Sequence, residues 1–278
     1  MPPPEVEAGL RRLAEDRTSG SLELALAAID LMGYGPNPDP EVLRKLAHDI
    51  AAAQPAMAAV RNAAFFCLTA RQDSIAYRVN YLDAVKAFRR FVETSRPKAG
   101  RQFLKMVEGA ASVVTLSHSS TVLEALRLLH GRHALTSVIV LESLPGGEGR
   151  ATVEALRAEG ILAEMRPDGE HASAVAASDL VLLGADTIYR DGGVANKVGS
   201  RALAVAAREA GKRVYVVTET IKLDHTRPSS AATFPPGALF EVLPPSLLDG
   251  IATERGVLPP SRFTELSGDG PGAEAPPP

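Results

Sequence analysis

The sequence has only one of the cysteines that form disulfides and metal clusters, and it has no long apolar run of the kind that spans a membrane. It has one cysteine, Cys67, no tryptophan, and only 5% aromatic residues. A single cysteine excludes an internal disulfide and a multi-cysteine metal site, and it fits a reducing compartment. No apolar run approaches the ~18 residues that a membrane helix needs, and no secretory signal is visible at the start. We therefore expect a cytoplasmic protein with no membrane partner, no metal and no cofactor.

An excess of positive charge is also missing. The formal net charge is −3 over 278 residues, so no global basic field attracts nucleic acid, and we expect no direct contact with it. With 45% hydrophobic and 23% charged residues, the composition is that of a globular protein large enough for two small domains. One local basic cluster, interpreted as a solvated helix end and linker, comprises Arg89, Arg90, Arg96, Lys98 and Arg101.

Apolar residues recur at helical spacing from about residue 6 to residue 93. Asp39, Pro40 and Glu41 form the pattern of an N-cap, a proline at the first helical position and an acid in the first turn. A further helix is expected from Tyr81 to Val92, ending near Arg96-Pro97. We predict a helical N-terminal domain over residues 5–95.

The pattern then changes to short β-branched runs that alternate with helical segments. Such alternation predicts a parallel sheet with right-handed crossovers, and strands that are apolar throughout indicate a sheet covered on both faces. The fold class is therefore α/β, with a Rossmann-like doubly wound parallel sheet over residues 100–263 and a disordered tail over 264–278. The expected strands are 112–116, 137–141, 161–165, 180–183, 213–218 and 239–242, and the expected helices are 121–130, 150–158, 172–177 and 200–210.

Glycines and one polar motif predict the helix ends of this domain. Gly131, Gly160 and Gly211 stand where helix C-caps belong, and Thr121 with Glu124 fits a capping box. Ligands of open α/β sheets sit outside the carboxyl ends of the strands. That rule selects four connections as candidate sites, namely residues 117–120, 142–149, 184–199 and 219–226.

The connection 184–199 carries the strongest signal. Asp186 directly follows an apolar strand, where partial burial can tune a carboxyl group for proton transfer. Gly192-Gly193 would let the backbone approach a ligand closely, Asn196 offers a donor and an acceptor, and Lys197 supplies a positive charge near the next helix. The alternative is a solvated turn in which Asp186 only caps a helix.

Two further connections have the chemistry to hold a phosphate. Hydroxyl groups of Ser117, Ser119 and Ser120, with the N-terminus of the following helix, could bind one, or could simply cap that helix. The loop 142–149 could cradle a phosphate through backbone N–H groups with Arg150 as counter-charge, or could be a plain turn. A Ser-His hydrolase is disfavoured because no Gly-x-Ser-x-Gly elbow is present.

Several of these segments together resemble a known family. Gly184-Ala185-Asp186 followed by residues 193–199 is similar to the shared motif of the translation initiation factor 2B α/β/δ subunits, methylthioribose-1-phosphate isomerase and ribose-1,5-bisphosphate isomerase. The segment 219–222, ending in Lys222, resembles the Glu-Thr-x-Lys segment of the initiation-factor and ribose-bisphosphate branches. Residues 240–245 and 253–258 resemble the closing signature of the family, and residues 16–21 resemble its N-terminal glycine loop more weakly.

The resemblance implies a helical N-terminal domain, a Rossmann-like C-terminal domain, and homodimers formed through the latter. In the isomerases, a cysteine and the aspartate of Gly-Ala-Asp act in a site that binds a sugar phosphate, and an asparagine and a lysine hold it. Carried over, the matching residues are Asp186, Asn196, Lys197 and Gly20. Taking the resemblance together with the loop chemistry, we expect catalysis by Asp186 and Ser117, and substrate binding by Gly20, Ser119, Arg150, Asn196, Lys197 and Lys222.

The sequence departs from the isomerase pattern at four positions. Ser117 stands at the cysteine position, and a serine hydroxyl is a far weaker acid than a thiol. Ser19, Gln54 and Leu144 stand where the family has arginines, which removes bidentate phosphate grips.

Two hypotheses remain open. The first is an aldose-ketose isomerase, an intramolecular oxidoreductase acting on a ribose 1-phosphate derivative, with Ser117 or His118 partly replacing the cysteine. The second is a non-catalytic subunit resembling initiation factor 2B that senses a phosphorylated sugar or nucleotide. Both make a phosphorylated small molecule the partner.

Overall fold

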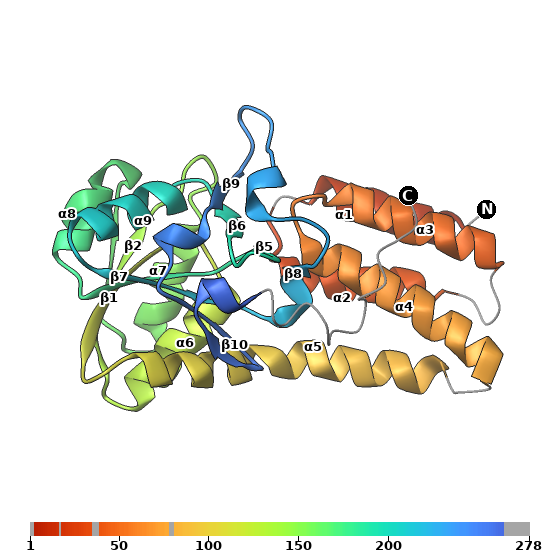
Figure 1. Cartoon of the computed structure of the whole chain (residues 1–278), viewed down its shortest axis with the longest axis horizontal. Coiled ribbons are helices and arrows are strands. Elements are labelled where there is room, and N and C mark those ends of the chain that lie inside the picture. The colour runs from red at the N-terminus through yellow and green to blue at the C-terminus, as the bar shows by residue number, and fades with distance from the viewer. Residues whose placement is uncertain (1–2, 17, 35–38, 78–80, 264–278) are drawn as a thin grey trace. The chain divides into compact units, whose positions relative to one another are not determined.

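The computed structural model describes residues 3–16, 18–34, 39–77 and 81–263, without the side chains of 71–77, 81, 82 and 84 (Figure 1). The chain divides into two compact units. The helical unit holds the residues up to Thr94 together with Ile221–Leu223, and the Rossmann-like unit holds Ser95–Thr220 and the chain from Asp224. The predicted tail 264–278 lies outside the described residues. In the part that is described, no helix combines the length and apolarity needed to cross a membrane.

The helical unit is built from amphipathic helices, as the spacing of apolar residues predicts. Asp39 caps one of them, because its Oδ1 accepts from the Glu41 N–H at 2.8 Å, with Pro40 at the first helical position. The buried faces meet in an alanine-rich core in which α2 packs against α4. The helices are α1 (Pro4–Glu15), α2 (Ser21–Met32), α3 (Pro40–Ala53), α4 (Ala58–Tyr77) and the first part of α5 (Tyr81–Phe103).

A distant segment of the chain is tied into this unit by one side chain. The Asn62 amide Nδ2 donates to the carbonyl oxygens of Ile221 at 2.6 Å and of Leu223 at 2.8 Å. These two bonds hold the backbone on both sides of Lys222, which is 5% exposed.

Helix α5 continues past the proline at which we expected it to end. Pro97 lies inside the helix, which runs to Phe103, and the basic cluster from Arg89 to Arg101 lies along it rather than on a linker. A proline removes one helical hydrogen bond, a cost that burial of nearby residues can offset. Ala99 and Phe103, both after the proline, are fully buried in the core of the Rossmann-like unit.

The Rossmann-like unit contains a seven-stranded sheet of order β11-β10-β7-β4-β1-β2-β3. All neighbouring pairs are parallel except β10 and β11. The strands are β1 (Ala111–Leu116), β2 (Leu135–Leu141), β3 (Ala163–Arg166), β4 (Leu180–Leu183), β7 (Arg213–Val217), β10 (Gly250–Thr253) and β11 (Gly256–Leu258).

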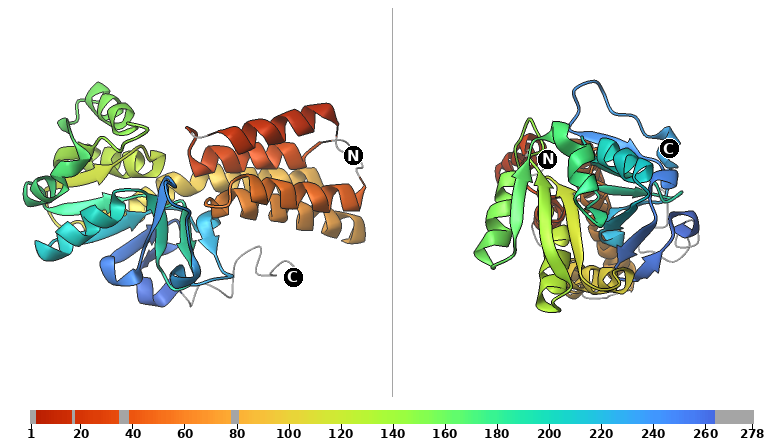
Figure 2. Two further views of the ribbon diagram at one scale, coloured as in Figure 1. Left: turned by 90° about the horizontal axis from the view of Figure 1, so that it is seen from above. Right: turned by 90° about the vertical axis from the view of Figure 1, so that its left-hand side faces the viewer.

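Helices cover both faces of this sheet (Figure 2). The end of α5 packs with α6 (Ser120–Gly131) and α7 (Gly149–Ala158) in one core cluster, which includes Val113, Val138 and Leu182. On the opposite face of the sheet, residues such as Val114 and Val181 are also buried. Helix α9 (Ser200–Glu209) contacts β4 and β7. A further short helix, α8 (His171–Ala176), packs against α9. The doubly wound α/β architecture is therefore confirmed.

A second, four-stranded sheet of order β8-β5-β6-β9 was not predicted. The connection that we expected to be a loop forms an antiparallel hairpin of β5 (Thr187–Tyr189) and β6 (Val194–Lys197). The expected strand 239–242 forms β9 (Phe240–Leu243), which pairs with β6 instead of joining the parallel sheet. The edge strand is β8 (Leu223–Asp224). The sequence of residues 184–199 does not reveal this hairpin, because β5 and β6 are only three and four residues long.

Two predicted helix ends were also wrong. Ser119, not Thr121, is the N-cap of α6, because its Oγ accepts from the Val122 N–H at 3.3 Å. The left-handed residue after α6 is His133 with φ of 56°, whereas Gly131 belongs to the helix. Gly160 and Gly211 do adopt positive φ directly after their helices.

We expect Asn62→Ala to lower the free energy of unfolding by about 1–3 kcal/mol, because two carbonyl groups lose their donor. Urea denaturation measures the change. Lys45→Ala, which removes an exposed ion pair with Asp49, is the control and should change stability by less than about 1 kcal/mol. Equal effects of the two substitutions would contradict the anchoring role of Asn62.

Candidate functional site

The strand order reverses between β1 and β4, which makes the loops after these two strands the walls of the expected ligand crevice. The loops approach each other closely at Gly184. A Cβ atom at Gly184 would lie 2.8 Å from the Ser119 Oγ, so a side chain there would force Ser119 to move. Gly184 therefore lets the Gly-Ala-Asp segment and the serine-rich loop meet at the carboxyl edge of the sheet.

Ser117, at the cysteine position of the resembling isomerases, has a φ of 61°. Non-glycine residues rarely adopt this left-handed conformation, and such strain clusters at functional sites. The Thr152 hydroxyl donates to the Ser117 carbonyl at 2.8 Å, and the His118 Nδ1 lies 3.0 Å from the same hydroxyl. Because Thr152 uses its only proton on Ser117, we infer that the His118 Nδ1–H donates to Thr152.

Ser119 has the role of a helix cap, the alternative that the sequence left open. Its hydroxyl oxygen accepts from the Val122 N–H and lies against the backbone of Gly184. Direct binding of a ligand by Ser119 stays a prediction.

Asp186 lies directly after β4 and is half-buried. Its N–H donates to the Ala195 carbonyl at 2.9 Å, and β5 pairs Thr187 with Ala195. Extending the antiparallel register by one residue sets Asp186 opposite Asn196. The residues after Asp186 form a strand, so the alternative that it caps a helix is wrong.

Asn196 and Lys197 are neighbours in β6, and each is 8% exposed. The Asn196 amide donates to the Ser200 Oγ at 2.9 Å, and Ser200 in turn donates to the Lys197 carbonyl at 2.6 Å. The Lys197 ammonium pairs instead with the Glu148 carboxylate in the β2–α7 loop. The two side chains that the motif assigns to one ligand thus have different partners, as alternation along a strand requires.

The β2–α7 loop does not offer the backbone cradle that we considered for a phosphate. Its Ser143 and Leu144 N–H groups donate to the two Asp168 carboxylate oxygens, both at 2.8 Å. The Gly147 N–H donates to the Ser143 carbonyl. Arg150, the proposed counter-charge, is an exposed residue in the first turn of α7.

Gly192 and Gly193, in the β5–β6 turn, lie close to other segments of this chain. This corrects the expectation that they let a ligand approach the backbone. A Cβ at Gly192 would lie 2.1 Å from the Pro260 carbonyl oxygen, and one at Gly193 would lie 2.4 Å from the Ser229 Cβ. The Asp191 carboxylate accepts from the Ser229 N–H and hydroxyl at 2.9 and 2.7 Å. These glycines admit neighbouring segments.

Gly20 and Lys222, the other two predicted binding residues, belong to the helical unit. Gly20 is the N-cap of α2, with a φ of −72° and open space where a Cβ would stand, so neither backbone nor packing demands glycine there. Just before it, the Asp16 carboxylate accepts from the Thr18 and Ser19 N–H groups, both at 2.8 Å. The backbone bond from Ser19 is the main cause that lowers the Asp16 pKa.

Gln54, at one of the missing arginine positions, has a structural role in the same unit. Its buried amide donates to the carbonyl oxygens of Leu13 at 2.7 Å and of Asp16 at 3.1 Å. The side chain therefore holds the turn that leads toward Gly20.

Sequence reasoning missed two acids at the same sheet edge, Glu219, which is buried, and Glu254, which is half-buried. The Glu219 carboxylate, fully buried after β7, accepts from the Thr121 hydroxyl of α6. Glu254, in the β10–β11 turn, accepts from the Thr220 N–H at 3.0 Å. Burial raises the pKa of Glu254, against the hydrogen bonds from Thr220, and the charge of Glu219 raises it further. The loop 219–226 was selected by its position, but nothing local pointed to Glu254.

Buried polar atoms without a hydrogen-bond partner gather around the candidate site. Among the described residues, four such atoms lie at the carboxyl ends of β1, β2 and β7 or in the loops that follow. Buried polar groups are normally paired, so orphaned ones ask for a functional explanation. The atoms are Thr115 Oγ1, Ser143 Oγ, Glu148 Oε2 and Thr218 Oγ1.

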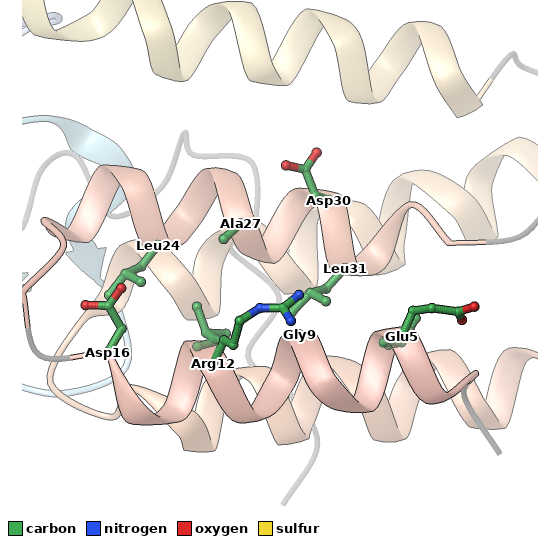
Figure 3. Close-up of a pocket in the computed structure, with 10 residues that line it drawn as sticks. Glu5, Gly9, Arg12, Asp16, Leu24, Ala27, Asp30 and Leu31 are labelled. Atoms are coloured by element: carbon green, nitrogen blue, oxygen red, sulfur yellow. The ribbon is translucent and has the colours of Figure 1, made fainter.

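A groove of about 370 Å³ lies between α1 and α2 in the helical unit (Figure 3). Its walls mix apolar side chains with charged ones, and the Arg12 side chain extends across it. The Asp30 carboxylate on its rim is paired with Arg89. Apart from Asp16, none of its lining residues belongs to a segment that the sequence singled out, and we assign no ligand to it. The lining residues are Glu5, Val6, Gly9, Arg12, Leu13, Asp16, Leu24, Ala27, Asp30 and Leu31.

The raised pKa of Glu254 gives a test of the acid pair. The folded state holds the Glu254 proton more tightly than the unfolded state, so stability should fall as pH rises from the ordinary value of 4.5 through the raised pKa. Glu254→Gln should remove this part of the slope and be at least as stable as the wild type at neutral pH. Urea denaturation at several pH values measures it, with exposed Glu209→Gln as control. An unchanged slope in Glu254→Gln would contradict the assignment.

Comparison with known proteins agrees with the fold and the motif. The model of the initiation factor 2 subunit family matches residues 8–238. A translation initiation factor eIF-2B subunit 2-like protein of Pyrococcus horikoshii is 31% identical over 236 residues, covering 80% of this chain and 83% of that protein. Ribose 1,5-bisphosphate isomerase of Archaeoglobus fulgidus is 27% identical over 241 residues, covering 79% and 77%.

Among solved structures, the translation initiation factor eIF-2B of Pyrococcus horikoshii OT3 superposes with a TM-score of 0.83. The two chains are 27% identical, and the match covers 94% of this chain and 98% of that one. The resemblance drawn from the Gly184–Gly199 segment is thereby confirmed over most of the chain. The protein belongs to the initiation factor 2 subunit family.

Proposed function

We propose that this protein binds a phosphorylated sugar at the carboxyl edge of its parallel sheet and acts as a sugar-phosphate isomerase. The observation that carries the proposal is that buried polar atoms without a hydrogen-bond partner lie at the carboxyl ends of β1, β2 and β7, on both sides of the point where the strand order reverses. Polar groups buried without partners suit a site whose partner is a ligand rich in hydroxyl and phosphate oxygens. The similarity to ribose 1,5-bisphosphate isomerase supports the same class of ligand.

The proposed reaction converts an aldose into a ketose, starting from a ribose 1-phosphate derivative. The C1–O4 ring bond must open, with a proton supplied to O4, and one group must remove the proton from C2 to give the enol. The enol then loses the proton of its C2 hydroxyl and receives a proton at C1, which leaves the ketone at C2. Asp186 is the candidate to move the proton or to polarise a hydroxyl, because it is half-buried at the crevice. Ser117 stands at the position that a cysteine occupies in the related isomerases, and Thr152 links the His118 ring to the Ser117 carbonyl.

A second candidate function is binding without turnover. Two observations favour it: a serine stands where the isomerases have their cysteine, and the Lys197 ammonium already has an internal carboxylate partner. Such a protein would sense a phosphorylated sugar or nucleotide and leave it unchanged.

Asp186→Asn should abolish turnover of ribose 1,5-bisphosphate or methylthioribose 1-phosphate while leaving binding within a few-fold, because the amide keeps the shape but cannot take a proton. Proton NMR measures conversion, and calorimetry measures binding. Ser117→Cys is the informative partner variant, since a thiol is the stronger acid and should speed any residual reaction. Binding without conversion by the wild type would leave the sensing function, and no binding of either compound would remove both.

We also propose a cytoplasmic homodimer that associates through the Rossmann-like unit. The edge strand β3 carries an exposed Met165 and follows Leu162, which is 71% exposed, and apolar side chains beside an unpaired strand edge favour association. Light scattering after gel filtration should give twice the 29.3-kDa mass of the chain. Leu162→Glu should shift the mass toward the monomer. A wild-type monomer at micromolar concentration would contradict the proposal.

A further inference from the structure

The ion pair between Lys197 and Glu148 is an unusual feature of the candidate site. Lys197 belongs to the motif that resembles the sugar-phosphate isomerases, yet its ammonium is bound by the carboxylate of a residue 49 positions earlier. The two side chains are only 10% and 24% exposed, so water screens the pair weakly. Any anion that needs Lys197 meets this carboxylate first.

The loop that carries Glu148 is shaped to bring the carboxylate to this position. A Cβ at Gly146 would lie 2.3 Å from the Glu148 Oε1, so the carboxylate lies close over the backbone of its own loop and would have to shift if Gly146 carried a side chain. The Asp168 carboxylate fixes the start of the loop through the Ser143 and Leu144 N–H groups. At its end, a Cβ at Gly149 would lie 2.3 Å from the Leu141 carbonyl oxygen, so the backbone packs tightly there.

The pair leaves one carboxylate oxygen unsatisfied. Glu148 Oε1 faces Lys197, whereas Glu148 Oε2 is buried and has no hydrogen-bond partner. A buried carboxylate oxygen without a donor is costly, so the paired arrangement is poised for exchange. Once another anion takes over Lys197, the Glu148 carboxylate can turn to water, because residues 144–146 of its loop are exposed.

We propose that Glu148 competes with the ligand for Lys197: its carboxylate occupies the face of the Lys197 ammonium that an anionic ligand group requires, and a ligand binds by displacing it. This inference rests on the proposed binding of a sugar phosphate. A phosphate monoester carries up to two negative charges and three acceptor oxygens, so its bonds to the ammonium can offset the loss of the ion pair. The pair therefore lowers the affinity for every anionic ligand that must reach Lys197, and only an anion that binds the ammonium strongly displaces Glu148.

Calorimetry with ribose 1,5-bisphosphate at fixed ionic strength tests the role of Glu148. Glu148→Gln keeps the shape but removes the competing charge, so it should bind about tenfold more tightly than the wild type. Glu154→Gln removes the same charge from an exposed position on α7 and should bind within twofold of the wild type. The gain should vanish when Lys197→Met is combined with Glu148→Gln. Affinity for gluconate should also rise in Glu148→Gln, and by no larger a factor than for the bisphosphate, because one carboxylate repels a singly charged ligand less than a dianionic phosphate.

The possible failures are distinguishable. Wild-type binding with no gain in Glu148→Gln, or a gain that persists without Lys197, would overturn the role of Glu148 and leave the proposed function standing. No binding by the wild type or any variant would overturn both. If Glu148→Gln is too unstable for calorimetry, the shift of its melting temperature by inorganic phosphate replaces that measurement. This shift should exceed that of the wild type, with the shorter Glu148→Asp in between, and equal shifts would overturn the inference.

Discussion

The close approach of two loops at Gly184 is the constraint on which the candidate site depends. Parallel strands that diverge from a reversal of order leave a crevice at their carboxyl ends, and the crevice exists only where no side chain fills it. Here the loop after β4 meets the loop after β1 so closely that a Cβ at Gly184 would force Ser119 to move. Ser119 is also the cap of α6, and the segment after Gly184 leads into the hairpin that carries Asn196 and Lys197. Fold and site therefore share one packing requirement.

Three positions at which this sequence departs from the isomerase pattern now have physical descriptions. Gln54 donates to two carbonyl groups that shape the turn before Gly20. Leu144 is 56% exposed, and its backbone N–H donates a hydrogen bond to the Asp168 carboxylate. Ser117 holds a strained conformation whose carbonyl receives the Thr152 hydroxyl. At these three positions the residues that depart from the pattern therefore take part in local hydrogen bonds within the chain.

Sequence patterns could predict whatever depends on neighbours along the chain. The strand Leu180–Leu183 follows directly from its continuous apolar run, and the Asp39 cap follows from its residue type beside Pro40. Features fixed by distant partners could not be predicted. Thr121 has the form of a capping residue but donates to Glu219, 98 positions away.

The same limit explains why the candidate site was only partly foreseen. The motif named Asp186, Asn196 and Lys197, and the rule for sheet edges located them correctly at the end of β4 and in the following hairpin. Neither could show that Lys197 is paired with Glu148, because that contact joins strand β6 to the β2–α7 loop, two segments with no common pattern. Helix α5 passed through Pro97 for a similar reason, since burial of Ala99 and Phe103 is decided by the sheet.

Three internal carboxylates bind backbone N–H groups or the Lys197 ammonium, which are groups that could otherwise bind a phosphate. The Asp168 carboxylate accepts hydrogen bonds from backbone N–H groups of the β2–α7 loop, and the Glu241 carboxylate accepts from the Gly199 and Arg201 N–H groups at the start of α9. The Glu148 carboxylate forms an ion pair with Lys197. The first two each accept from a pair of N–H groups, and a carboxylate bound in that way is difficult to displace. Glu148 is different, because one of its oxygens faces an ammonium group and the other is buried without a partner. An anion that enters this edge of the sheet should therefore bind the Lys197 ammonium, and the Glu148 carboxylate is the group that it displaces.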